Sequence, residues 1–218
     1  HQHRDLFYLT GVDQEDTALI IFPDSPIEKY KEVLFVRRTD EVIAVWEGAK
    51  LTQQQATEVS GIENVMWFDQ LDSVLQTITH HARTIYVDLN EHDRGNNAFP
   101  DRNRREADKL RERYPLHVYE RSAPIMEQLR MFKHDIEIEL MQRACDITEK
   151  GFRRVLEFVK PGVYEYEIEA EIAREFLRNK ATGFAYHPII ASGKDTCVLH
   201  YIQNCKQCED GDLLLMDF

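Results

Sequence analysis

The pattern of apolar residues changes once along the chain, at residues 121–124, and this change constrains the fold more than any other feature. Before it, short runs rich in β-branched and aromatic residues alternate with short amphipathic segments, which predicts strands interleaved with helices. After it, apolar residues recur at helical spacing from Ile136 to Val159 and again from Glu165 to Lys180. We therefore expect domains of different architecture at residues 1–122 and 123–218.

The first region predicts an α/β layer structure, because its strands and helices alternate. Strands are expected at residues 7–12, 17–22, 33–36, 65–68, 84–89 and 116–119. Helices are expected at residues 52–60, 69–82 and 102–113, and a loop at residues 91–97. Thr52 is a suitable N-cap for its helix, and Gly61 is a suitable stop.

The second region predicts an α+β arrangement of two long helices followed by strands. Pro161 and Gly162 end the first helix, and strand-like segments follow at residues 188–191, 198–201 and 213–218. The last of these is an apolar run that requires neighbouring strands, whereas natural termini are usually polar and frayed. We therefore expect the sequence to be an excerpt of a longer polypeptide.

Charge and composition exclude several classes of protein. The chain has 27 basic and 39 acidic residues, a net charge of −12, which disfavours non-specific binding to nucleic acid or to an anionic membrane. No window contains the ~20 apolar residues of a membrane span. The four cysteines form no spaced disulfide framework, and the pair Cys205 and Cys208 lacks the partners of a zinc site. We therefore expect a folded protein that resides in a reducing compartment, the cytoplasm.

His200 and Asp217 are the candidate functional residues. His200 lies in the predicted strand 198–201, where a histidine is more often a hydrogen-bonded structural residue than a catalytic one. Asp217 closes the apolar run Leu213–Met216. Burying an unpaired carboxylate costs several kcal/mol, so Asp217 is expected to be solvated, paired or bound to a cation. From residue spacing alone, the hypothesis goes no further than a metal site at Asp217.

Residues 196–204 and 210–217 resemble the first half of the catalytic core of the aminopeptidase P, prolidase and creatinase family, the pita-bread metallopeptidases. Segments that fit the same pattern in order lie at residues 130–148, 160–162, 165–168 and 190–193, and residues 4–11 resemble part of the family's N-terminal domain. The resemblance implies an α/β N-terminal domain of the creatinase/prolidase type. The first half of an α+β pita-bread catalytic domain would follow it, without the start of the first domain or the second half of the second.

The resemblance also implies roles for the two candidate residues. Asp217 matches the first of five ligands that hold two divalent metal ions, commonly Mn(II), and His200 matches a histidine that contacts the substrate beside the metals. Carboxylates with one imidazole suit Mn(II), and paired metals generate a hydroxide nucleophile. Because the sequence stops one residue after Asp217, the other four ligands are missing. The 218 residues alone are therefore expected to be inactive.

The motif His-Tyr-x-x-Asn at residues 200–204 favours the proline-directed members of the family over methionine aminopeptidases. The implied activity is that of a Xaa-Pro aminopeptidase, a hydrolase that cleaves between an N-terminal residue and a following proline. That bond has no N–H, so its recognition requires a dedicated pocket. The resemblance further implies a homodimer or homotetramer formed through the N-terminal domain.

Two alternatives to this activity remain open. The first is a prolidase restricted to Xaa-Pro dipeptides, or a creatinase-like hydrolase, which would differ in pocket residues. The second is a non-catalytic pita-bread binding module, against which the carboxylate at Asp217 argues.

Overall fold

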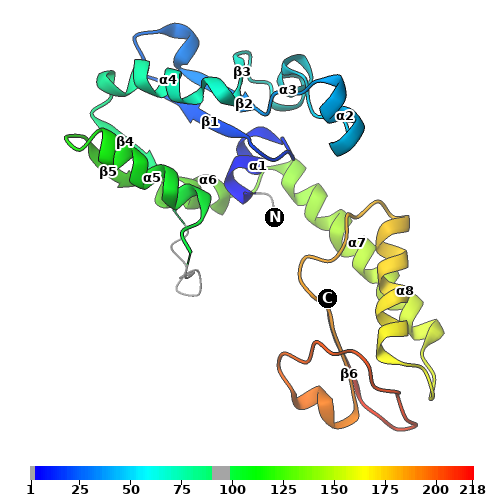
Figure 1. The fold of residues 1–218 in the computed structure, drawn as a ribbon. Helices are drawn as coiled ribbons and strands as arrows, with labels where there is room; N and C mark the ends of the chain where they lie inside the picture. Colours follow the sequence, from blue (N-terminus) through cyan, green and yellow to red (C-terminus); the bar gives the residue numbers. More distant parts are fainter. Residues whose placement is uncertain (1–2, 90–98) are drawn as a thin grey trace. The chain divides into compact units, whose positions relative to one another are not determined.

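The computed structural model describes residues 3–89 and 99–218, and its contacts divide the chain into two units, His1–Met131 and Phe132–Phe218 (Figure 1). The predicted loop 91–97 lies outside the described residues. The division comes one helix later than the predicted boundary between residues 122 and 123. Helix α6 (Ala123–Met131) belongs to the first unit because Arg130 pairs with Asp5, and the Tyr8 hydroxyl donates to the Leu129 carbonyl.

The first unit is built on the sheet of β1 (Ala18–Ile21), β2 (Glu32–Val36) and β3 (Val65–Trp67). Strand β2 is central, antiparallel to β1 and parallel to β3. Its side chains are buried on both faces, since Leu34 and Val36 belong to one apolar cluster while Val33 and Phe35 belong to another. Helix α3 (Gln53–Ser60) contributes to the first cluster, and α4 (Leu71–Ile78) contributes to the second.

Several boundaries follow directly from local chemistry. In α3 the Thr52 hydroxyl caps the Gln55 N–H, the Gln55 side chain caps the Thr52 N–H, and Gly61 ends the helix at φ 73°. Helix α5 (Arg102–Arg113) has the predicted bounds and is capped by Asp101. The parallel strands β4 (Thr84–Val87) and β5 (Val118–Arg121) flank it in sequence. Shorter helices among the described residues of this unit include η1 (Glu28–Tyr30), α2 (Glu41–Glu47), η2 (Phe68–Gln70) and η3 (Thr79–His81).

The predicted strand at residues 7–12 is wrong, because these residues lie largely in helix α1 (Arg4–Thr10). The His3 side chain accepts from the Leu6 N–H at the start of the helix, and the Thr10 hydroxyl donates to the Leu6 carbonyl within it. Gly11 ends the helix in the left-handed region at φ 66°. The caps of this segment thus outweigh the strand propensity of its aromatic and β-branched residues.

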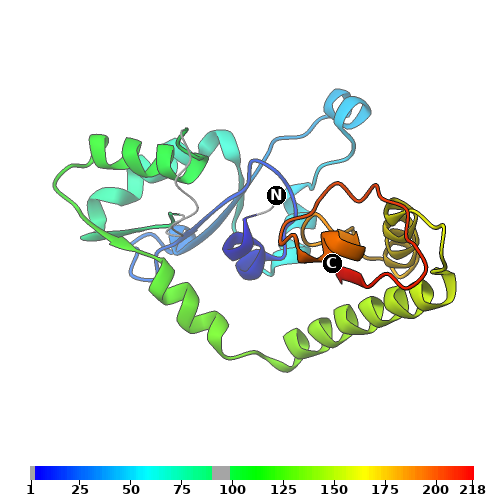
Figure 2. The ribbon, with the colours of Figure 1, turned by 90° about the horizontal axis from the view of Figure 1, so that it is seen from below.

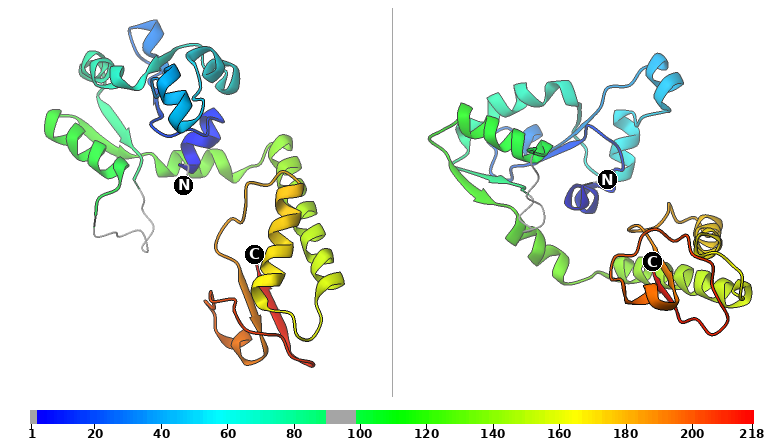
Figure 3. Two further views of the ribbon diagram at one scale, coloured as in Figure 1. Left: turned by 45° about the vertical axis from the view of Figure 1, so that its right-hand side comes forward. Right: turned by 60° about the horizontal axis from the view of Figure 1, so that its bottom comes forward.

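The second unit contains α7 (Asp135–Phe158), α8 (Glu165–Arg178), β6 (Ile189–Ser192), η5 (Gly193–Cys197) and β7 (Leu214–Asp217). The helices lie side by side, and β6 and β7 form an antiparallel pair (Figures 2 and 3). The core combines the apolar face of α8 with residues of α7, β6 and β7; its α8 members are Ile168, Ile172 and Phe176. This is the predicted order of two helices followed by strands.

Two contacts hold α7 against α8. Gly151 permits a close approach, since a Cβ atom there would lie 3.3 Å from a ring carbon of Phe176. The Arg154 guanidinium donates to the Glu171 carboxylate at 2.7 Å. That hydrogen bond lowers the pKa of Glu171 and raises the pKa of Arg154. Among the helices of residues 3–89 and 99–218, none combines the length and the hydropathy needed to cross a bilayer.

Candidate active site

Asp217 lies in β7, opposite Ile189 of β6 in the antiparallel register. Its side chain is exposed, and a carboxylate oxygen accepts a hydrogen bond from the Tyr186 hydroxyl, on the segment that leads into β6. This hydrogen bond, together with burial, raises the pKa of Tyr186. The carboxylate is therefore both solvated and paired, as expected for an acidic group at the end of an apolar run.

The run before Asp217 is not the buried strand that its composition predicts. Leu213 is 71% exposed and Leu215 37% exposed, while Leu214 and Met216 pack on the core. An open groove of about 510 Å³ is lined by Thr148, Glu149 and Phe152 of α7 and by the end of β7, including Asp217. Asp217 thus borders an accessible hollow.

His200 is not in a strand, which corrects the prediction for residues 198–201. Its segment links η5 to β7, and its backbone pairs with no strand in the described part of the second unit. The Val198 N–H instead closes a turn on the Asp195 carbonyl at 2.9 Å. The His200 side chain is exposed. Among the described residues, no hydrogen bond or ion pair joins His200 to Asp217.

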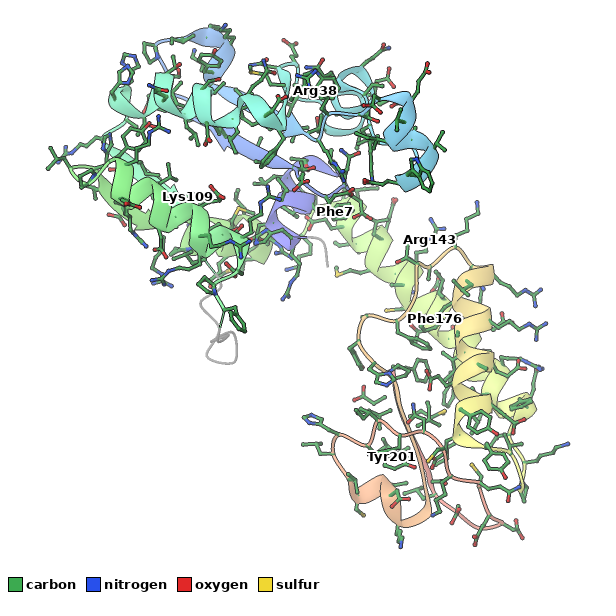
Figure 4. All side chains as sticks on the ribbon, in the orientation of Figure 1. Phe7, Arg38, Lys109, Arg143, Phe176 and Tyr201 are labelled. Carbon is green, nitrogen blue, oxygen red and sulfur yellow. The ribbon has the colours of Figure 1, made fainter. Side chains whose placement is uncertain are left out.

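Glu165, the first residue of α8, is the most unusual side chain near His200. It is fully buried, and its carboxylate accepts hydrogen bonds from the Ser192 N–H and hydroxyl at 2.7 and 2.8 Å, the Tyr201 hydroxyl at 2.8 Å, and the Lys206 N–H at 2.9 Å. Figure 4 shows Tyr201 among the side chains of the second unit. Burial, followed by the hydrogen bond to Glu165, raises the pKa of Tyr201. A buried carboxylate with four donors is fully satisfied.

Asn204 is a second buried polar residue on the same segment, held in the left-handed region at φ 43°. Its carbonyl oxygen accepts from the Ile190 N–H at 2.9 Å. Its amide group donates to the Pro188 carbonyl at 2.9 Å and to Glu169 at 2.8 Å. Both residues lie in segments that resemble the family, Asn204 as the last residue of the His-Tyr-x-x-Asn motif and Glu165 as the first residue of segment 165–168. Nothing in the sequence predicts that either side chain is buried.

Residues 3–89 and 99–218 contain no group of three or more His, Cys, Asp or Glu side chains that could hold a metal ion. The donor set around Asp217 therefore does not fit a complete metal site. Asp217 and His200 both lie in the second unit, and both side chains are exposed.

The four cysteines are free thiols. Cys208 belongs to the apolar core of the second unit, and burial raises the pKa of its thiol. Cys205 is exposed. The pair 205 and 208 is therefore divided between core and surface.

Comparison with known proteins adds to this geometry. Residues 1–86 match the family model "Aminopeptidase P, N-terminal domain", and residues 139–218 match "Metallopeptidase family M24". The chain is 30% identical to the Xaa-Pro aminopeptidase of Escherichia coli over 222 aligned residues, which covers 99% of this chain and 49% of that protein. The chain thus spans about half the length of the curated relatives it matches.

Two solved structures have the same fold across the chain. The aminopeptidase PepP of Pseudomonas aeruginosa matches with a TM-score of 0.85 at 28% identity, over 100% of this chain and 49% of that chain. A zinc-substituted Escherichia coli aminopeptidase P in complex with product matches with a TM-score of 0.80 at 31% identity, over 100% and 49%. The chain belongs to the aminopeptidase P family, and it consists of that family's N-terminal domain followed by part of an M24 pita-bread catalytic domain.

Proposed function

We propose that the full-length protein containing this chain is a Xaa-Pro aminopeptidase, which hydrolyses the bond between an N-terminal residue and a following proline. The observation that carries the proposal is the M24 match over residues 139–218, the region that contains both His200 and Asp217. The similarity to Xaa-Pro aminopeptidases over 99% of the chain supports the substrate class.

In this proposal His200 contacts the peptide substrate and Asp217 is one ligand of a pair of divalent ions, with Mn(II) as the metal. The exposure of both side chains supports these roles, because each is accessible to a ligand. The remaining ligands have to come from outside the described residues, which hold no such cluster. The chain of 218 residues alone is therefore expected to be inactive.

The proposal extends to assembly and location. A homodimer or homotetramer through the N-terminal domain is proposed from the family resemblance. A cytoplasmic location is proposed because Cys145, Cys197, Cys205 and Cys208 are all free thiols, which suits a reducing compartment. The net charge of −12 supports a peptide rather than a nucleic acid as the partner.

The test is hydrolysis by the full-length protein of a Xaa-Pro-Xaa tripeptide, a Xaa-Pro dipeptide and creatine, each with added Mn(II) and with a chelator. Turnover of the tripeptide that the chelator abolishes supports the aminopeptidase. Turnover confined to the dipeptide indicates a prolidase, and turnover of creatine indicates a creatinase-like hydrolase. Peptide binding without turnover of any substrate would identify a non-catalytic module and overturn the proposal.

His200→Ala tests the residue assignment separately. We expect a lower kcat in a protein that remains folded, because the exposed imidazole is removed without loss of a buried contact. An unchanged rate would return His200 to a structural role.

A further inference from the structure

The segment that carries His200 is fixed at few points. Between Val198 and Gln203, all of which the structure describes, Tyr201 is the one side chain that is not exposed, and Leu199, next to His200, is 84% exposed. The position of the imidazole is therefore not set by packing of its own neighbours. It depends on the hydrogen bonds that anchor Tyr201 and the residues that follow.

The first anchor is the carboxylate of Glu165. It accepts from the Tyr201 hydroxyl, one residue after His200, and from the Lys206 N–H. The Glu165 N–H donates to the Lys206 carbonyl at 3.0 Å in return. The other carboxylate oxygen is bound by Ser192, at the end of β6. One buried carboxylate thus joins α8, β6 and the His200 segment.

The second anchor is the carboxamide of Asn204. It bonds the Ile190 N–H and the Pro188 carbonyl, which lie on and just before β6, and it reaches Glu169 of α8. Asn204 is 2% exposed, so these bonds are shielded from water. The two anchors therefore hold both ends of the stretch from Tyr201 to Asn204 against the same strand and helix.

We propose that Glu165 and Asn204 are positioning residues for His200: through Tyr201 and the backbone of β6, they fix where the exposed imidazole lies. This inference rests on the proposed function, in which His200 contacts the substrate. The chemistry favours these residue types. A carboxylate only accepts hydrogen bonds, so it satisfies two N–H groups and two hydroxyls at once, whereas the amide of Asn204 serves an N–H and a carbonyl together.

The test uses Tyr201→Phe and Asn204→Asp in the full-length protein. Tyr201→Phe removes the hydroxyl that reaches Glu165 and leaves the ring and Glu165 in place. Asn204→Asp removes the donors to Pro188 and Glu169 and keeps the acceptor for Ile190. Tyr166→Phe is the matched control, because Tyr166 is an exposed tyrosine on α8.

We expect Tyr201→Phe and Asn204→Asp each to lower kcat for the tripeptide about 10-fold or more with KM changed less than about 3-fold, since small displacements of a reacting group are costly. Tyr166→Phe should retain the parent rate. In a His200→Ala background the same two substitutions should have no further effect on kcat, because their effect acts through the imidazole. Equal losses in the two backgrounds would show a merely structural role and overturn the inference.

Hydrogen exchange separates this inference from the proposed function. The backbone amides of Ser192 and Lys206, which donate to the Glu165 carboxylate, should exchange at least about 10-fold faster in Tyr201→Phe than in Tyr166→Phe. If the parent protein hydrolyses none of the peptides, the proposed function fails, and positioning of His200 for catalysis fails with it. If the peptides are hydrolysed but exchange at Ser192 and Lys206 is unchanged, the proposed function stands and the positioning is refuted.

Discussion

Glu165→Gln is the substitution whose effect on stability follows most directly from the structure. The side chain keeps its size, but one oxygen becomes an NH₂ group that donates instead of accepting. In the parent chain one carboxylate oxygen accepts from the Ser192 N–H, and the other accepts from the Lys206 N–H. Whichever way the amide turns, its NH₂ group faces one of these backbone donors.

The expected cost can be worked from these contacts. The Ser192 and Tyr201 hydroxyls can rotate to accept from the new NH₂ group, but a backbone N–H cannot. One buried N–H therefore loses its acceptor, which costs about 1–3 kcal/mol. The remaining hydrogen bonds become weaker because their acceptor is neutral instead of charged, but a neutral amide is also easier to bury than a carboxylate. Together these two effects reduce the free energy of unfolding by about 1 kcal/mol. We expect the second unit to lose about 3 kcal/mol of its free energy of unfolding.

The assay is urea unfolding of the 218-residue chain, followed by circular dichroism at 222 nm and by tryptophan emission. Trp46 and Trp67 both lie in the first unit, so tryptophan emission reports that unit alone. The control is Glu157→Gln, the same change at a side chain that is 73% exposed on α7. We expect Glu165→Gln to lower the midpoint of the helix signal and to leave the tryptophan midpoint unchanged, and Glu157→Gln to shift neither.

A change of less than about 0.5 kcal/mol in Glu165→Gln, no larger than in a typical surface variant, would refute the reasoning. It would mean that the carboxylate does not accept from both backbone donors. A fall in both midpoints would instead show that the two units unfold together.

Three further predictions concern packing, pH and the candidate ligand. Gly151→Ala should change stability by less than about 1 kcal/mol in urea unfolding, because the gain in helix propensity offsets the 3.3 Å approach to Phe176, whereas Gly151→Leu should cost more than about 2 kcal/mol. The raised pKa of Tyr201 means that the unfolded chain ionises first above pH ~10, so stability falls as pH rises beyond that value; Tyr201→Phe should remove this component in unfolding measured at pH 9 and pH 11. Asp217→Asn in the full-length protein should weaken Mn(II) binding in calorimetric titration and lower tripeptide turnover at least about 100-fold, since loss of groups behind a ligand already costs up to that.

The sequence predicts best the helices whose ends carry capping residues. Thr52 with Gln55 and Gly61 define α3 locally, and Asp101 does the same for α5. The aromatic and β-branched residues at 7–12 predict a strand, which is wrong because the caps at His3 and Gly11 stabilise a helix. Local signals therefore succeed where a cap coincides with the apolar pattern and fail where the two disagree.

The candidate site was only partly predictable for a different reason. His200 and Asp217 were identified through motif resemblance, but the contacts that hold them join residues far apart in sequence. Glu165 meets Tyr201 across 36 positions, and Asn204 meets Ile190 across 14. Glu165 stands in the first turn of α8, where acidic residues are common, and its buried carboxylate is bound by Ser192, Tyr201 and Lys206, which lie 27 to 41 positions away in sequence.

Strand β6 gives the two candidate residues a common frame. All four of its residues are buried, and its register with β7 places Ile189 opposite Asp217 and Ile190 opposite Met216. The same Ile190 donates its N–H to Asn204, and Ser192 at the end of the strand binds Glu165. One edge of β6 therefore pairs with β7, which carries Asp217. The N–H groups of Ile190 and Ser192 bind Asn204 and Glu165, which hold the segment that carries His200. Among the described residues no hydrogen bond joins the two groups directly, so a distortion within β6, between its contacts with β7 and those with Asn204 and Glu165, would change their separation.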